Sequence, residues 1–289
     1  MISAPLKNCH VCGKSNWKKV QGKLRDKPEI GIIKCSSCGL VTLETTNHIS
    51  EQLYQDSKMR PGAKNEEWVS ILKHCLRDDQ RRVKQFRPLI ENKSVLDFGC
   101  GSGGFLLKAE DVAKDVCGIE LDEYFVNKLR SEGKIKIFNS VSDIDTKFDC
   151  ITLFQVLEHL TTPKDILLRL KDKLKSDGKL IIEVPNSNDA LLSMYGSEAF
   201  SNFTYWSCHV FLYNSLNLRM LAESLGFKVH YVSQYQRYPI SNHLYWLAKG
   251  EPGGHEIWDQ LDSEHLNMEY RAMLSENDAC DTLVMSLGL

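Results

Sequence analysis

Residues Val95–Phe105 read VLDFGCGSGGF, and this stretch decides the fold. Its first four residues have the apolar character of the end of a buried strand. The glycines at 99, 101, 103 and 104 then predict a tight turn that opens a helix. Because glycines leave the backbone N–H groups at a helix start open to a ligand, we expect a ligand to bind at this turn.

The glycines alone leave two classes of ligand open. Gly99, Gly101 and Gly104 fit the G-x-G-x-x-G pattern of dinucleotide-binding proteins. Asp97 extends the pattern to D-x-G-x-G-x-G, which resembles motif I of class I S-adenosylmethionine-dependent methyltransferases. In that family the turn holds the methionine part of the cofactor and the acid orients the loop. Glu120, about 20 residues further on, is the type of carboxylate that accepts hydrogen bonds from ribose hydroxyls in both classes.

Strand and helix patterns alternate from Lys93 onward, which predicts a doubly wound α/β domain. The resemblance implies a Rossmann-like seven-stranded methyltransferase sheet with helices on both faces and an antiparallel last strand. The expected strands are Ser94–Phe98, Asp115–Glu120, Lys134–Asn139, Lys147–Phe154, Lys179–Val184, Phe227–Ser233 and Asp281–Ser286. The expected helices are Gly103–Glu110, Glu123–Ser131 with Asp122 as its cap, Pro163 to about Lys175 closed by Asp177-Gly178, and Ser215–Leu225 capped by Asn214.

Two C-x-x-C-G motifs lie in the first 40 residues. Cys9 and Cys12 form the first, and Cys35 and Cys38 form the second. Paired knuckles of this kind bring four thiolates to one tetrahedral site, so we expect a structural Zn²⁺ in a zinc-ribbon-like module. Such a closed site is favoured over a catalytic zinc or a redox pair. The short extended segments Lys18–Val20 and Ile30–Lys34 fit the hairpin of a zinc ribbon, and we interpret the other six cysteines as small core residues.

The domain organisation follows from these patterns. We expect a zinc-binding module over 1–48, a helical linker or lid over 49–92, and the methyltransferase domain over 93–289 with an insertion at about 235–280. Arg60-Pro61-Gly62 should break any helix that begins near Ile49, and an amphipathic helix is expected from Asn65 to about Ile90. Within the insertion, Leu244, Trp246 and Leu247 are either part of a pocket or core residues.

Composition places the chain among ordinary globular proteins. The 289 residues are 42% hydrophobic and 26% charged, with a net charge of −2. Neither an apolar run of about 18 residues nor a signal sequence is apparent, so we expect a cytoplasmic protein without membrane contact. Residues 1–90 carry 17 Lys or Arg against 9 Asp or Glu. This excess fits an anionic partner, but the simpler interpretation is a solvated helix face.

The resemblance also implies which residues bind the cofactor. The fourth predicted strand runs into Gln155-Val156-Leu157-Glu158-His159-Leu160, a pattern that a dehydrogenase has no reason to carry. Ser140 and Val141 occupy the position where relatives place the adenine. The expected cofactor-binding residues are Asp97, Gly99, Cys100, Gly101, Gly103, Glu120, Leu121, Ser140, Val141 and Gln155.

The LEHL segment supplies the catalytic candidates. His159 is our first candidate for a general base and Glu158 for the group that orients it, although the pair fits a strand cap equally well. His209 is a second base or a substrate contact. Some relatives bind a divalent metal through E-x-x-E-H and a later histidine. Because Gln155 replaces the first glutamate, we do not expect a catalytic metal.

A zinc module joined to such a domain resembles bacterial methyltransferases of sugars and surface-polysaccharide precursors. Sugar C-methyltransferases of that group continue into a further domain that this sequence lacks, so we expect O-methylation of a sugar, sugar nucleotide or similar small precursor. The expected substrate contacts are Tyr54, Tyr205, His209, Arg237 and Asn242. The alternatives are C-methylation of a keto-sugar nucleotide, an RNA or protein methyltransferase that binds its substrate with the zinc module, and a non-enzymatic scaffold.

Overall fold

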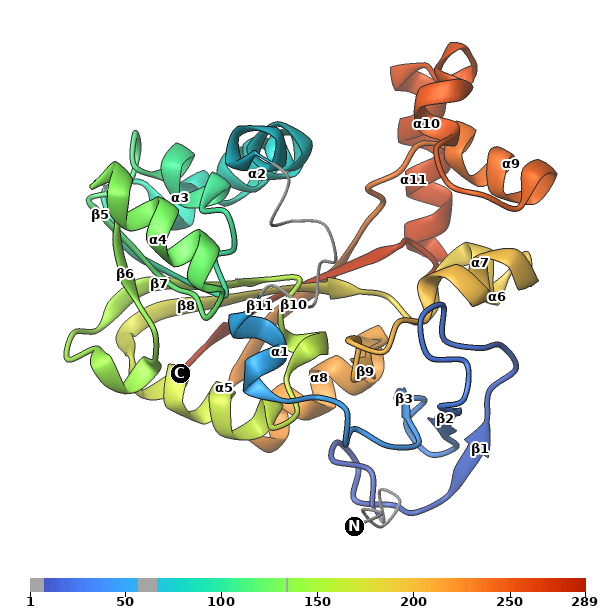
Figure 1. Ribbon diagram of the computed structural model, residues 1–289, viewed down its shortest axis with the longest axis horizontal. Helices are drawn as coiled ribbons and strands as arrows, with labels where there is room; N and C mark the ends of the chain where they lie inside the picture. Colours follow the sequence, from blue (N-terminus) through green and yellow to red (C-terminus); the bar gives the residue numbers. More distant parts are fainter. Residues whose placement is uncertain (1–7, 57–66, 134) are drawn as a thin grey trace.

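The computed structural model describes residues 8–56, 67–133 and 135–289, which form two β-sheets and the helices around them (Figure 1). The expected helix break at Arg60-Pro61-Gly62 lies outside the described residues. The larger sheet has seven strands, and the smaller sheet has four.

The seven-stranded sheet confirms the predicted fold class. Its order is β10-β11-β8-β7-β4-β5-β6, and β11 runs antiparallel to both of its neighbours while the other pairs are parallel. The strands are β4 (Ser94–Phe98), β5 (Asp115–Ile119), β6 (Lys136–Phe138), β7 (Phe148–Phe154), β8 (Leu174–Pro185), β10 (Lys228–Tyr235) and β11 (Thr282–Gly288). Since β5 and β7 lie on opposite sides of β4, the glycine turn that follows β4 sits at a topological switch point.

Helices cover both faces of this sheet. In Figure 1, α2 (Trp68–Ile90), α3 (Gly104–Ala109) and α4 (Glu123–Glu132) lie on one face, and α5 (Pro163–Asp172) and α8 (Ser215–Ser224) lie on the other. Both predicted caps are confirmed. The Asp122 side chain accepts a hydrogen bond from the backbone N–H of Tyr124, and Asn214 forms a capping box with Asn217.

The predicted end of α5 is wrong. The helix stops at Asp172, and β8 begins at Leu174, which pairs with Phe148 of β7. Gly178 therefore lies inside a strand and does not close the helix. A Cβ atom at Gly178 would lie 3.0 Å from the carbonyl oxygen of Phe148, so the glycine permits a close approach of the two strands.

The four-stranded sheet joins the N-terminal segment to the main domain. It consists of the antiparallel strands β1 (Trp17–Lys19), β2 (Ile32–Cys35), β3 (Val41–Leu43) and β9 (Phe211–Leu212). The hairpin of β1 and β2 matches the zinc-ribbon expectation. The fourth strand, β9, comes from a segment almost 170 residues later in the sequence, and sequence patterns gave no sign of it.

Side chains strengthen this junction. The Thr42 hydroxyl donates to the Val210 carbonyl at 2.8 Å, and the Asn217 side chain donates to the Cys38 carbonyl at 3.2 Å. The hydrophobic core that contains Leu40 also contains Leu218 of α8. The cysteine module is therefore packed into the main domain along one shared core.

The insertion between β10 and β11 is helical and projects from the end of the sheet (Figure 1). It contains α9 (Ile240–Lys249), α10 (Gly254–Ile257), the 3₁₀ turn η4 (Asp259–Leu261) and α11 (Glu264–Glu276). Trp246 is buried here, whereas Leu244 and Leu247 are exposed. The core interpretation therefore holds only for Trp246.

Short helical elements complete the chain. They are α1 (Glu51–Gln55), α6 (Ala190–Ser193), α7 (Glu198–Thr204) and the 3₁₀ turns η2 (Val141–Asp143) and η3 (Leu157–His159). Among the helices that the structure describes, none combines the length and the apolar content needed to cross a bilayer.

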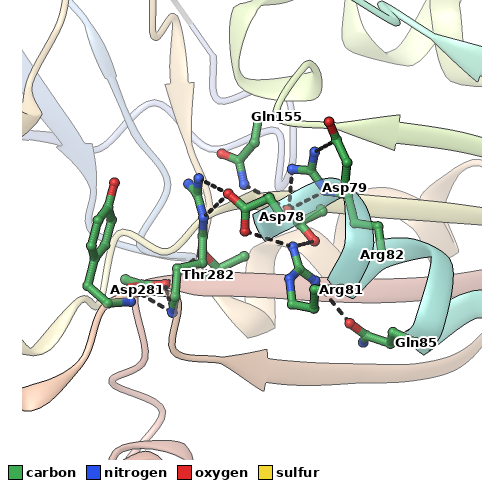
Figure 2. Close-up of polar contacts among 11 residues, drawn as sticks. Asp78, Asp79, Arg81, Arg82, Gln85, Gln155, Asp281 and Thr282 are labelled. Carbon is green, nitrogen blue, oxygen red and sulfur yellow. Dashed lines mark hydrogen bonds and ion pairs between the residues drawn. The ribbon is translucent and has the colours of Figure 1, made fainter. Parts of the chain in front are cut away.

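A buried ion-pair network holds α2 against the sheet (Figure 2). Glu183 of β8 is fully buried and accepts hydrogen bonds from Arg81 at 2.7 Å and from Arg82 at 2.6 Å. At the neighbouring turn of α2, Asp78 pairs with Arg237 from the segment after β10. The expectation of a solvated basic face is wrong for Arg81 and Arg82, whose side chains are only 12% and 10% exposed.

Removing the metal with a strong chelator tests the shared sheet. Because β9 is the fourth strand of the module's sheet, we expect amide hydrogen exchange to accelerate in residues 207–213 as well as in 8–45, on the order of tenfold, while β7 stays protected. Hydrogen-exchange mass spectrometry measures this. Faster exchange in 8–45 with unchanged exchange in 207–213 would show that the two parts are independent.

Glu183→Gln tests the ion-pair network. Removal of the Glu183 charge leaves two poorly solvated guanidinium groups whose partners among the described residues are the more distant carboxylates of Asp78 (3.5 Å from Arg81) and Asp79 (3.4 Å from Arg82). We therefore expect the free energy of unfolding to fall by about 3 kcal/mol. Urea denaturation measures the change. As the matched control, Arg87→Gln breaks the exposed pair between Arg87 and Glu91 and should change the free energy by less than about 1 kcal/mol. Equal small effects of both substitutions would contradict the account.

Candidate active site

A cavity of about 630 Å³ opens at the carboxyl ends of β4, β5 and β7. Its volume is in the range of small-molecule binding sites. The walls come from the glycine turn, the end of β5, the segment that contains η3, and one face of α2. Arg237 and Tyr54 also reach this cavity.

The glycine turn forms the floor of the cavity. Gly101 has a φ angle of 55°, in the left-handed region that favours glycine, and the space where a Cβ would stand is open. Gly99 also has a left-handed φ angle, and a Cβ there would lie 2.6 Å from a methyl carbon of Val156. The turn is thus both open to a ligand and packed closely against the segment that leads into η3.

Glu120 holds the turn in place. Its carboxylate accepts hydrogen bonds from the backbone N–H groups of Gly101 at 2.6 Å, Leu121 at 2.7 Å and Asp122 at 2.9 Å. A carboxylate offers about four acceptor positions, so roughly one position remains for a ligand hydroxyl. Binding a ribose diol through both hydroxyls would require one of these backbone contacts to loosen.

Carboxyl groups dominate the charge of the cavity wall. Burial raises the pKa of Asp97 to about 7, and the Thr152 hydroxyl, which donates to Asp97 at 2.7 Å, opposes this rise. Burial likewise raises the pKa of Asp79 to about 6. The wall includes six carboxyl groups and two guanidinium groups, namely Glu51, Asp78, Asp79, Asp97, Glu120, Asp122, Arg82 and Arg237. This balance favours a cationic ligand over the anionic pyrophosphate of a dinucleotide.

Gln155 adopts a strained backbone at the end of β7. Its φ angle is 59°, which is uncommon for a residue other than glycine. Its backbone N–H donates to the Glu183 carbonyl at 2.8 Å, and its side-chain amide lies 3.4 Å from the Glu183 carboxylate. The ion-pair network therefore also orients this part of the cavity wall.

The 3₁₀ turn η3 carries Glu158 and His159. Glu158 is 1% exposed, and burial raises its pKa to about 8. Within the described part of the chain neither of its carboxylate oxygens has a hydrogen-bond partner. The His159 Nδ1 lies 2.8 Å from the Cys208 carbonyl oxygen, and the Tyr54 hydroxyl donates to the His159 carbonyl at 3.0 Å.

The structure brings many of the predicted site residues to the cavity wall. They are Asp97, Gly99, Cys100, Gly101, Glu120, Leu121, Gln155, His159, Tyr54 and Arg237. The other predicted residues do not line the cavity formed by the described part of the chain. They are Gly103, Ser140, Val141, Glu158, His209, Tyr205 and Asn242. Glu158 and His209 still pack around His159.

Local packing explains the residues that lie elsewhere. Tyr205 is buried with Leu24 and Val41 in the small core under the four-stranded sheet. Asn242 is buried in α9, where its side chain lies 3.3 Å from a ring nitrogen of His255. The Ser140 hydroxyl caps η2, which turns that loop toward its own backbone.

The lid expected over 49–92 includes α2, but sequence reasoning did not single out the α2 residues that line the wall. Asp79 and Arg82 continue the stripe of buried positions that begins at Ile71 and ends at Phe86 and Ile90. Charged residues at the helical spacing of an apolar stripe were the signal that could have located them.

The four cysteines of the N-terminal module fit a zinc site. Their sulfur atoms all lie within 4.8 Å of one another, with Cys9 to Cys38 and Cys12 to Cys35 at 3.5 Å. Sulfur atoms bonded to one tetrahedral zinc ion at about 2.3 Å lie roughly 3.8 Å apart. Such an ion would tie β2 to the first knuckle.

Comparison with known proteins supports the same class. A family model described as a methyltransferase domain matches residues 72–232. The ubiquinone biosynthesis O-methyltransferase of Hydrogenovibrio crunogenus is 29% identical over 143 residues, which cover 44% of this chain and 57% of that protein. The tRNA U34 carboxymethyltransferase of Shewanella baltica is 31% identical over 114 residues, which cover 35% of this chain and 34% of that protein. The chain thus spans less than two thirds of the length of either relative.

A solved structure shows the same fold. A chain in the complex between the Haloferax volcanii Trm112 methyltransferase activator and a methyltransferase superposes with a TM-score of 0.51 and 15% identity, covering 76% of this chain and 93% of that one. The family model covers more than half of the sequence, and the cavity lies where that fold binds ligands. The chain therefore belongs to the methyltransferase domain family.

Proposed function

We propose that this chain transfers the methyl group of S-adenosylmethionine to an oxygen atom of a sugar, a sugar nucleotide or a similar small polar molecule. The main support for this proposal is the cavity above the glycine turn, which is lined by acidic residues. S-adenosylmethionine bears a sulfonium and an ammonium group, and the excess of carboxyl groups on the wall complements both charges.

Three acidic residues of the cavity wall, Glu120, Asp97 and Asp79, would hold the cofactor. Glu120, with its remaining acceptor position, is suited to a ribose hydroxyl. Asp97 and Asp79 are suited to the cationic end. Burial raises the pKa of both carboxyl groups, and a positive charge bound beside them would stabilise their carboxylate forms. When bound, the cofactor supplies an activated methyl group with its own leaving group. The protein then has to align the acceptor oxygen with the methyl group and to accept the proton that the hydroxyl group loses.

The acceptor side of the proposal rests on His159. Among the residues that the structure describes, it is the histidine that lines the cavity, and Tyr54 and Arg237 reach the same cavity. An imidazole at this position is suited to activating a hydroxyl group. The similarity to a ubiquinone biosynthesis O-methyltransferase supports an oxygen acceptor.

RNA is the second candidate acceptor, and the similarity to a tRNA U34 carboxymethyltransferase favours it. Two observations argue against RNA. Arg81 and Arg82 form ion pairs with Glu183, and the guanidinium of Arg25 in the N-terminal segment lies 4.5 Å from the Trp206 ring centre. These cations are therefore engaged within the protein.

Methyl transfer from labelled S-adenosylmethionine tests the proposal. We expect label in one or more members of a panel of sugars and nucleotide sugars, and none in total tRNA. Label in tRNA alone, with binding that weakens steeply as salt rises, would support the RNA candidate instead. Cofactor binding without transfer to either class would contradict the proposed acceptor.

His159→Asn tests the role of the imidazole. The asparagine amide can still donate to the Cys208 carbonyl, so the local fold should persist. We expect turnover to fall by about 10²–10⁴ while cofactor affinity changes by less than about twofold. His74→Asn, an exposed substitution on α2, is the control and should leave both quantities unchanged. Unchanged turnover in the His159 variant would remove this residue from the mechanism.

A further inference from the structure

We propose that Glu158, His159 and His209 form a binding site for a divalent transition-metal ion, separate from the four-cysteine site. One potential ligand atom from each of these three side chains lies within 4.8 Å of the other two. His159 also lines the cavity, so an ion held here would lie beside the cavity wall. Binding of an ion through Nε2 of His159 would occupy the ring nitrogen that a general base needs, because Nδ1 is engaged with the Cys208 carbonyl. The metal-bound form is therefore an alternative to the form in which His159 acts as a base.

Glu158 is the observation that points to a cation. Both carboxylate oxygens are shielded from solvent, and neither has a hydrogen-bond partner in the part of the chain that the structure describes. Buried carboxylates in native proteins are almost always paired or coordinated, because an unpaired one costs several kcal/mol. A neutral Glu158 would leave its own O–H group without an acceptor. A bound cation satisfies both oxygens.

The two histidines are arranged as metal ligands are. His159 directs Nδ1 at the Cys208 carbonyl oxygen at 2.8 Å, which turns Nε2 toward Glu158, 3.9 Å from Oε1. Donation of one ring N–H to a backbone carbonyl is the usual way in which a protein orients a ligating histidine. The ring of His209 lies with its centre 4.9 Å from that of His159, and its buried Nδ1 has no partner among the described residues.

The geometry requires only a small adjustment. Nitrogen and oxygen ligands around a tetrahedral ion with bonds of about 2.1 Å lie roughly 3.4 Å apart. The longest of the present separations, up to 4.8 Å, would have to shorten by about 1.4 Å, which rotations about side-chain bonds can provide. Two imidazoles and one carboxylate with open positions match Zn²⁺, Fe²⁺, Co²⁺ and Mn²⁺ better than Mg²⁺ or Ca²⁺.

Gln155 stands where the metal-binding relatives carry their first glutamate. That residue replaces a possible fourth ligand, and its side-chain amide lies 3.4 Å from the Glu183 carboxylate. The three remaining groups come together without it. His209 joins them because the segment before β9 is fixed by the four-stranded sheet.

Titration of the zinc-loaded full-length chain with Co²⁺ tests the site. Zinc occupies the thiolates, so we expect one additional Co²⁺ per chain by equilibrium dialysis and elemental analysis. Its visible bands should be weak and lack sulfur-to-cobalt charge transfer. Glu158→Gln, which keeps the side-chain volume, and His209→Asn should each weaken binding on the order of a hundredfold. His230→Asn, in β10 at the edge of the sheet, is the matched control and should bind Co²⁺ like the wild type.

Three results would overturn the proposal. The first is that the wild-type chain binds no additional Co²⁺. The second is that the wild type and Glu158→Gln bind Co²⁺ equally well. The third is that all visible absorption comes from Co²⁺ bound to sulfur. The wild-type titration decides the question even if a variant fails to fold. Absence of methyl transfer without added Co²⁺, together with intact Co²⁺ binding, would count against the proposed function and leave the metal site standing.

Discussion

The buried carboxylate of Glu183 is the constraint on which the rest of the site depends. Its two oxygens hold Arg81 and Arg82, and through them they fix α2 across the carboxyl edge of the sheet. This places Asp79 against the glycine turn, where a Cβ at Gly104 would clash with the Asp79 carboxylate. Glu183 also contacts Gln155, through both its backbone carbonyl and its side-chain carboxylate. One charge at the end of β8 thus shapes two walls of the cavity.

The four-cysteine module acts on the other side of the cavity. Its sheet includes β9, and the residues just before β9 provide the Cys208 carbonyl that orients His159 and place His209 beside it. A metal ion held by the four cysteines, which lie more than 120 residues earlier in the sequence, would therefore support the histidine on the cavity wall. The module is joined to the site by main-chain pairing and shared core packing, which makes it more than an appended domain.

Local signals predicted most of the fold. Ser94–Phe98 is β4 as expected, the glycine turn follows it, and Asp122 and Asn214 cap their helices, because strand patterns, turns and caps depend on neighbouring residues. The end of α5 was mistaken because pairing with β7 overrode a helix-stop signal at Gly178. Long-range pairing also produced β9 and the Glu183 network, of which adjacent sequence carries no trace. The cluster of Glu158, His159 and His209 was anticipated from the family resemblance, and the structure brings the three side chains together.

The central claim is that the glycine turn and Glu120 form a site for an adenosyl sulfonium cofactor and not for a dinucleotide. Calorimetric titration of the wild-type chain and of Glu120→Ala with S-adenosylhomocysteine, beside a parallel titration with NAD, tests it most directly. We predict stoichiometric binding of S-adenosylhomocysteine by the wild type, binding weakened on the order of tenfold or more in the variant, and no binding of NAD. Binding of NAD, or no binding of S-adenosylhomocysteine by the wild type, would contradict it.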